Sequence, residues 1–175
     1  MKNKIWLDQL RAEDRDTVFS LTSDPEIVKY MRFGTHKVPE EAEELIRNYT
    51  EKGNYGFLIR LTDSGEPIGV AAMKHDEENC LEYSVSLFSF QRFWNQGYNT
   101  AAVELLKTFA QEQGIRSLNA YVVEENYGSR KVMEKCGFHR TDILHFDDFS
   151  SGLYVYSLQI GSGDEKQEQA AAETS

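Results

Sequence analysis

One glycine turn that leads directly into a helix constrains this chain more than any other feature. The turn covers residues 95–100 and opens an amphipathic segment whose apolar residues lie on one side. A second helix start follows one strand later, at Asn126, and that helix ends at Gly137. Such helix starts present unpaired backbone N–H groups and the positive end of the helix dipole. The stretch therefore predicts a site for a phosphate or pyrophosphate.

Length and composition are those of one globular domain. The 175 residues are 40% hydrophobic and 12% aromatic, which is enough to bury a core without disulfides or metals. We expect the domain to span residues 1–160, with no internal repeat or linker. Residues 161–175 contain no aliphatic residue larger than alanine, and they predict an acidic, polar, disordered tail outside the fold.

Charge and hydropathy exclude several classes of partner. The 19 basic and 29 acidic residues leave a net charge of −10, so nucleic acid is not expected, whereas a cationic amine suits the overall field. No apolar run approaches the length of a membrane span and no signal-peptide core follows the first residues, which predicts no membrane partner and a cytoplasmic location. The histidines show no metal-ligand spacing, so no metal is expected; they are His36, His75, His139 and His145.

Hydrophobic periodicity predicts a mixed α/β domain with the order β-α-α-α-β-β-β-α-β-α-β-β. The expected strands are 5–10, 57–61, 68–74, 81–88, 118–123, 138–144 and Leu153–Gln159. The expected helices are 14–21, 25–31, one beginning at Pro39, 100–113 and 129–136. Cys80 and Cys136 lie in apolar strand-like and helix-like settings, so we expect two buried free thiols and no disulfide.

Three motifs occur in register along the second half of the chain. They are Trp94-Asn95-Gln96-Gly97-Tyr98-Asn99-Thr100, Asn126-Tyr127-Gly128-Ser129 and Glu134-Lys135-Cys136-Gly137-Phe138. Together they resemble the GNAT superfamily of acyl-CoA-dependent N-acetyltransferases, and within it the branch of ribosomal-protein N-terminal (alanine/serine) acetyltransferases. The resemblance covers residues 5–158. It implies a single α/β domain with a mixed, mostly antiparallel sheet of six to seven strands, splayed in the middle and flanked by four to five helices.

The resemblance implies acetyl-CoA as cosubstrate. Backbone N–H groups of the turn would hold the pyrophosphate, while Gly97 permits close approach and Thr100 adds a hydroxyl. The pantetheine arm would lie between strands 81–88 and 118–123, with Asn126 either hydrogen-bonding it or capping its own helix. The expected cofactor-binding residues are Arg92, Asn95, Gln96, Gly97, Tyr98, Asn99, Thr100, Asn126 and Ser129, with Arg130 a less secure phosphate contact.

The implied reaction is acetyl transfer to a primary amine by direct attack in a ternary complex, because no cysteine is placed as a nucleophile. It needs a neutral amine and a proton for the leaving thiolate. Glu82 is the expected base, acting through water, and a solvent-facing strand residue is the equal alternative. Many relatives place a tyrosine acid seven residues after the asparagine, where this chain has Met133. Ser129 is therefore the expected acid, ahead of Tyr127, unless it is only a first-turn hydroxyl.

Two departures in the turn leave a second class of function open. Asn95 stands where the family usually has glycine and Asn99 where it usually has alanine, although asparagine tolerates a positive φ better than most residues. A non-catalytic module that binds or senses acetyl-CoA is therefore the alternative to an enzyme. A Rossmann dinucleotide site is excluded, because the turn follows a strand meander and lacks G-x-G-x-x-G.

The acceptor amine stays open between a protein N-terminus, a polyamine, an aminoglycoside and another small molecule. Residues 14–49 and the loop 147–152 are expected to set this choice. Aromatic and apolar side chains in the first of these segments either line an acceptor pocket or belong to the core; they are Tyr30, Met31, Phe33 and Tyr49. A homodimer is compatible with the sequence.

Overall fold

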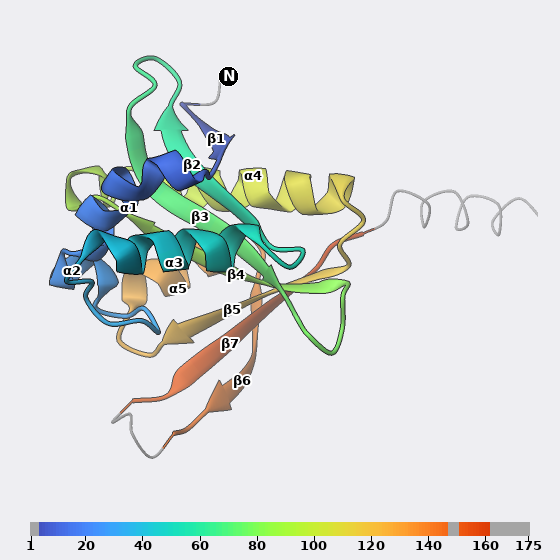
Figure 1. Cartoon of the computed structure of the whole chain (residues 1–175). Helices are drawn as coiled ribbons and strands as arrows, with labels where there is room; N and C mark the ends of the chain where they lie inside the picture. The colour runs from blue at the N-terminus through green and yellow to red at the C-terminus, as the bar shows by residue number, and fades with distance from the viewer. Residues whose placement is uncertain (1–3, 147–150, 162–175) are drawn as a thin grey trace, which may run out of the picture.

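A computed structural model of the chain describes residues 4–146 and 151–161. Within these residues seven strands form one sheet in the order β1-β2-β3-β4-β5-β7-β6, flanked by five α-helices (Figure 1). The strands are β1 (Ile5–Gln9), β2 (Tyr55–Leu61), β3 (Pro67–His75), β4 (Glu82–Ser89), β5 (Ser117–Val123), β6 (His139–Leu144) and β7 (Leu153–Gln159). The helices are α1 (Arg15–Thr22), α2 (Pro25–Val28), α3 (Pro39–Thr50), α4 (Tyr98–Glu112) and α5 (Tyr127–Lys135), with 3-10 turns η1 (Ala12–Asp14) and η2 (Gln91–Phe93). The predicted element order and the mostly antiparallel sheet are confirmed.

The sheet is splayed between β4 and β5. Of the strand pairs in the described residues, this pair alone is parallel, and it is joined over three positions, from Glu82↔Ser117 to Ser84↔Asn119. A parallel pair needs a long crossover, which η2 and α4 provide. Beyond Ser84 and Asn119 the two strands diverge, so their facing edges carry backbone groups without a ladder partner. The predicted splay in the middle of the sheet is confirmed.

The core lies in two layers, one on each face of the sheet. On one face α4 and α5 bury apolar residues against β1–β5, with Leu106 and Val103 fully inaccessible. On the other face α1, α2 and α3 pack on β2, β3 and β4 around Leu21 and Leu58 (Figure 1). Each such aliphatic side chain contributes about 1.5–3 kcal/mol by its removal from water. From β4, Val85 belongs to the first layer and Phe88 to the second, so both layers hold the strand beyond the point where it leaves β5.

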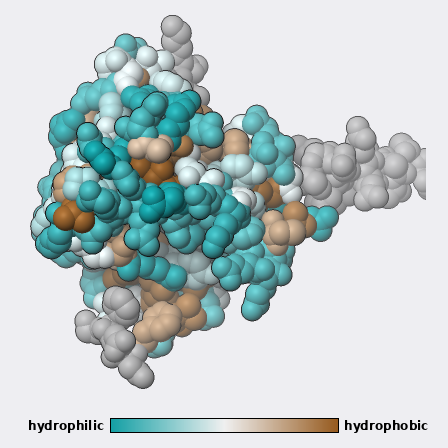
Figure 2. Space-filling model, in the orientation of Figure 1, coloured by the Kyte–Doolittle hydropathy of each residue, from teal (hydrophilic) through white to brown (hydrophobic). Residues whose placement is uncertain are grey.

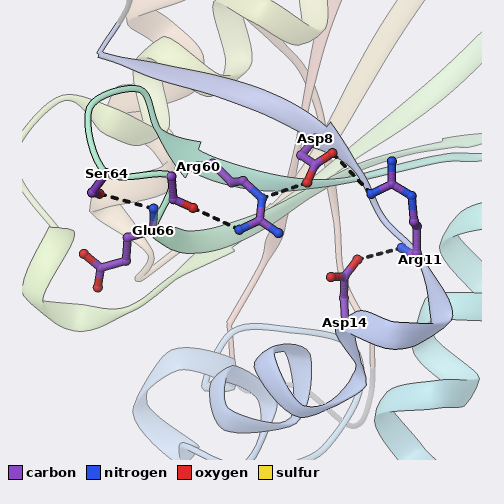
Figure 3. Close-up of polar contacts among 7 residues, drawn as sticks. Asp8, Arg11, Asp14, Arg60, Ser64 and Glu66 are labelled. Carbon is purple, nitrogen blue, oxygen red and sulfur yellow. Dashed lines mark hydrogen bonds and ion pairs between the residues drawn. The ribbon is translucent and has the colours of Figure 1, made fainter.

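A polar network ties β1 to the β2–β3 hairpin (Figure 3). The Arg60 guanidinium donates to Asp8 at 2.7 Å and to the backbone carbonyl of Gly65 at 2.9 Å. The hairpin turn is closed further by the Ser64 hydroxyl, which accepts from the backbone N–H of Glu66 at 3.2 Å (Figure 3). Because the turn is held in this way, the Glu66 side chain has a defined place beside the segment that follows β4.

Two expectations from the sequence need correction. Cys80 is exposed, so the prediction of two buried thiols was wrong for this residue and is confirmed for Cys136, and both are free. The reason is local: the Asp76 carboxylate accepts from the backbone N–H groups of Glu78 and Asn79, which folds residues 76–81 into a turn before β4. The helix predicted over 25–31 ends earlier, as α2.

The predicted tail, apart from residue 161, and residues 147–150 of the predicted specificity loop lie outside the described residues. In the described part of the chain, no helix combines the length and the apolar character that crossing a membrane requires. No group of three or more histidine, cysteine, aspartate and glutamate side chains converges there as a metal site would require. The face shown in Figure 2 is largely hydrophilic, with small separate hydrophobic areas.

Candidate active site

A cleft of about 560 Å³ opens where β4 and β5 diverge. Its walls come from β4, β5, α5, α3 and the segment between α2 and α3. Two predicted site residues of α5, Asn126 and Ser129, line it together with Met133. All four side chains expected from the sequence to border an acceptor line the same cleft; they are Tyr30, Met31, Phe33 and Tyr49. The divergence of two strands thus brings the predicted reaction end and the predicted acceptor residues into one space.

The predicted glycine turn lies directly before α4. Gly97 is the residue before the helix and has a φ of 83°, while Asn95 has a φ of 57°. Asparagine therefore replaces a glycine at a position that needs the left-handed region, which it tolerates. A Cβ placed on Gly97 would meet no atom within 4 Å, so the backbone angle and not a lack of space requires glycine. The helix begins at Tyr98, two residues earlier than predicted.

Two side chains at the start of the turn tie it to the end of β4 and to η2. The Trp94 indole N–H donates to the carbonyl of Ser89 at 3.0 Å, and the Gln96 amide donates to the carbonyl of Arg92 at 2.6 Å. In the described residues, no hydrogen bond is formed by the backbone N–H groups of residues 95–100. These donors lie at the positive end of a 15-residue helix, an arrangement that favours an anion even in an acidic protein.

Arg92 lies beside this turn but is already paired. Its guanidinium contacts the Glu66 carboxylate at 2.6 Å and lies 4.7 Å and 4.8 Å from the ring centroids of Phe90 and Phe93. Both partners of the ion pair are well exposed, so the pair contributes about 0–1 kcal/mol. A phosphate could displace Glu66 at small cost, and the two rings would keep the guanidinium near the turn.

The first turn of α4 also contains a buried polar atom without a partner. The side-chain carbonyl oxygen of Asn99 is inaccessible and has no hydrogen bond within the described residues. One residue later, the backbone carbonyl of Thr100 accepts a weak hydrogen bond from the Cys136 thiol at 3.7 Å. This contact joins the start of α4 to the end of α5.

The start of α5 is organised by Asn126. Its side-chain oxygen accepts from the backbone N–H of Ser129 at 3.2 Å, which confirms the helix-capping role and leaves the amide N–H donors for another contact. Arg130 is engaged elsewhere: it donates to the carbonyl of Glu124 at 3.0 Å and to the Tyr156 hydroxyl at 3.3 Å. Arg130 is thus built into the junction of β5, α5 and β7, whereas Asn126 and Ser129 face the cleft.

Comparison with known proteins decides the family. Residues 4–139 match the model of the acetyltransferase (GNAT) domain family, which is most of the chain. This protein is a GNAT acetyltransferase. It is accordingly an acyltransferase that depends on acetyl-CoA.

Relatives and solved structures agree with this assignment. The chain is 24% identical over 168 residues to an uncharacterised N-acetyltransferase, p20, of Bacillus licheniformis, covering 89% of this chain and 92% of that one. Spermidine N-acetyltransferase from Vibrio cholerae, solved with CoA and spermine, has a TM-score of 0.79 at 13% identity, with 90% and 96% of the two chains covered. A GNAT acetyltransferase from Bacillus anthracis has a TM-score of 0.76 at 22% identity, with 89% and 95% covered. These likenesses confirm the fold of the acetyltransferase.

Glu82 occupies a different place in the acetyltransferase from Ser129. It lies at the end of β4 that is still paired with β5, and it lines a neighbouring depression with Lys74, His75 and Asn119. The two hollows share a border that includes Ser84. Glu82 and Ser129 therefore line two adjoining hollows, which have six lining residues in common.

His36 is a cleft residue that sequence reasoning missed. It lies between α2 and α3, is only 8% exposed, and lines the cleft with Ser129. Burial lowers the pKa of His36, and the nearby carboxylates of Glu41 and Glu44 partly oppose this shift. In the sequence His36 was weighed only as a metal ligand. Its position three residues after Phe33, whose ring centroid is 5.2 Å away, is the one local signal that it belongs to a packed segment.

Tyr49 of α3 borders the cleft, and its side-chain hydroxyl is neutral. Its side chain is 3% exposed. Burial raises the pKa of Tyr49 to about 12, and a hydrogen bond with Ser86 of β4 opposes the rise. The acetyltransferase thus has a fixed hydroxyl opposite α5 that stays protonated at every working pH.

Proposed function

We propose that this acetyltransferase moves the acetyl group of acetyl-CoA to a primary amine by direct attack in a ternary complex. One observation carries the proposal: the diverging edges of β4 and β5 form a cleft that contains Asn126 and Ser129, next to a helix start whose N–H groups have no partner in the described residues. A ligand with a pyrophosphate at one end and an extended amide-bearing arm fits this arrangement.

The proposed contacts divide the cofactor between two elements. The backbone N–H groups of the turn bind the pyrophosphate, and Arg92 moves from Glu66 to a phosphate. The residues assigned to this part are Arg92, Asn95, Gln96, Gly97, Tyr98, Asn99 and Thr100. The pantetheine arm pairs with the open strand edges, and the Asn126 amide donates to it. This leaves the thioester beside Ser129.

The proposed reaction requires two proton movements. The amine nitrogen forms a bond to the acetyl carbon, the C–S bond breaks, and the electron pair leaves with the sulfur of CoA. The Ser129 hydroxyl donates a hydrogen bond to that thiolate, a role supported by its place in the cleft. Glu82 stays the base predicted from sequence, and it would have to act through water from the neighbouring depression.

The proposed acceptor is a primary amine that enters past Tyr30, Met31 and Phe33. These side chains favour an acceptor with an apolar part next to its amino group, and the net charge of −10 favours one that arrives as a cation. Two kinds of acceptor are supported by separate likenesses. The sequence resembles the ribosomal-protein N-terminal branch, and one structural neighbour is a spermidine N-acetyltransferase.

Release of free thiol from acetyl-CoA, measured with a panel of amines, tests the proposal. The panel holds peptides beginning with alanine or serine, spermidine and an aminoglycoside. We expect turnover with at least one class, initial-rate lines that intersect as a ternary complex requires, and a kcat for Ser129→Ala reduced by about 10²-fold. Parallel lines would contradict direct attack. Thermal stabilisation by acetyl-CoA without turnover on any amine would support the sensing module, and no stabilisation would contradict both functions.

A further inference from the structure

We propose that His36 takes the proton from the acceptor amine at the reaction end of the cleft. The proposal rests on the proposed function, because it assumes an amine acceptor and a thioester beside Ser129. It gives a chemical task to a buried titratable side chain that the resemblance to the family did not point to. It also supplies a proton acceptor on the same side of the Ser84–Asn119 junction as Ser129.

The position of the His36 ring is fixed by packing. The backbone N–H of His36 donates to the carbonyl of Thr22 at 3.0 Å. The Phe33 ring lies 5.2 Å from the imidazole, and Phe33 packs edge-on against Phe88 of β4 at 5.9 Å. The segment is therefore anchored to α1 on one side and to β4 on the other. A side chain held in this way presents its ring to the cleft in one orientation.

The two ring nitrogens of His36 are not equivalent. Nδ1 is inaccessible and has no hydrogen-bond partner within the described residues. The residue nevertheless lines the cleft, which leaves Nε2 as the nitrogen that an acceptor can reach. A nine-tenths buried imidazole without a polar partner is costly for a purely structural role, where an apolar side chain would suffice. A substrate that hydrogen-bonds to Nε2 would offset the cost of burying this imidazole.

The charges around His36 suit a group that starts neutral and gains a proton briefly. Burial lowers its pKa, so the imidazole is unprotonated and able to accept at neutral pH. Glu41 and Glu44 of α3 act in the opposite sense and stabilise the imidazolium once formed. Arg32 of the same segment and Lys74 of β3 are the cations that also line the cleft. Burial has the largest effect on the pKa of His36, ahead of the two carboxylates.

The proposed step is balanced in atoms and charge. The amine nitrogen attacks the acetyl carbon and gives one proton to Nε2 of His36, while the C–S bond breaks and CoA leaves as the thiolate. The proton then passes from His36 to water, and the thiolate, which accepts a hydrogen bond from the Ser129 hydroxyl, takes a proton from water. The products are the acetylated amine and CoA as its thiol, and no oxidant or metal takes part.

His36→Gln tests the proposal on the full chain. The matched control is His139→Gln, at an exposed histidine of β6, and Glu82→Gln tests the competing base. Glutamine places an amide nitrogen near the position of Nε2 but cannot accept the proton. The readouts are kcat against pH with the best amine of the panel, the Kd for acetyl-CoA and the thermal midpoint. In the wild type we expect kcat to fall as the pH drops through a pKa below the usual 6.5 of histidine, because the protonated ring no longer accepts.

In His36→Gln, kcat should no longer fall at acidic pH (the acidic limb of the pH profile). Its kcat should be lower by about 10²-fold or more, with an unchanged Kd for acetyl-CoA. His139→Gln should keep both kcat and the fall of kcat at acidic pH. A His36→Gln enzyme with wild-type kcat and an intact limb would overturn the assignment, as would loss of the limb in Glu82→Gln alone. If the thermal midpoint of His36→Gln collapses, His36→Asn carries the same comparison. A wild type that acetylates no amine would overturn the proposed function itself, which is a distinct result.

Discussion

The Asn126 side-chain oxygen accepts a hydrogen bond from the backbone N–H of Ser129 at 3.2 Å, and this bond sets the first turn of α5. It places Ser129 three residues into the motif, at the wall of the cleft between β4 and β5. Asn126 thus starts the helix and orients Ser129, which we propose donates a hydrogen bond to the CoA thiolate. Because its oxygen is used for the cap, only its amide N–H groups are available to the pantetheine arm.

Substitution of Asn126 should separate these two roles. Asn126→Asp keeps the accepting oxygen but loses the donor, so we expect wild-type stability and a weaker Kd for acetyl-CoA. Asn126→Ala should lose both, with an unfolding free energy lower by about 1 kcal/mol. Chemical denaturation and calorimetric titration measure the two effects. Wild-type affinity in Asn126→Asp would show that the residue is a helix cap and nothing more.

Gly97→Ala should lower the stability of the protein and, in addition, weaken its binding of acetyl-CoA. Gly97 and Gly114 flank the same helix with φ values of 83° and 73°, and a Cβ on either would meet no atom within 4 Å. Alanine at either position should therefore cost a similar 1–2 kcal/mol or so of backbone strain. Only Gly97→Ala should also raise the Kd for acetyl-CoA, and equal affinities in the two variants would argue against the pyrophosphate site.

Asn99→Ala should stabilise the protein. The variant removes a buried carbonyl oxygen that has no partner in the described residues, and it puts a better helix former in the first turn of α4. An unsatisfied buried polar group costs about 1–3 kcal/mol, of which we expect roughly 1 kcal/mol to be recovered. Urea denaturation of the two proteins gives the difference. A loss of stability would mean that the Asn99 amide forms a bond that matters to the fold.

Much of the fold and the cofactor turn followed from local sequence patterns. Alternation along the strands and apolar stripes along the helices predicted the element order, and Gly97 before an amphipathic segment predicted a glycine turn at a helix start. Both are properties of a few neighbouring residues. This is also why the helix boundaries shifted by about two residues, since capping at Gly97 depends on geometry that periodicity does not contain.

The arrangement of the reaction end could not be predicted in the same way. Whether Glu82 faces Ser129 depends on where β4 leaves β5, and three ladder positions decide this. His36 packs against Phe33, which in turn packs against Phe88, 52 positions from His36 along the chain. The exposure of Cys80 likewise results from a turn that begins at Asp76, although the sequence around Cys80 predicted a strand.

The two thiols should differ sharply in reactivity. Cys136 is 1% exposed, and burial raises the pKa of its thiol to about 12, whereas Cys80 is exposed. A thiol reagent should therefore label one cysteine in the native protein and a second only in denaturant. Cys80→Ala should abolish native labelling without changing acetyl transfer. Rapid labelling of two thiols in the folded protein would contradict the position of Cys136 between α4 and α5.

A crystal structure of the protein with CoA tests the central claim most directly. The account predicts the pyrophosphate on the backbone N–H groups of residues 95–100, the pantetheine between the open edges of β4 and β5, and the sulfur within hydrogen-bond reach of Ser129. It predicts Arg92 turned from Glu66 toward a phosphate. CoA seated outside the β4–β5 cleft, or with its sulfur in the depression lined by Glu82, would contradict it.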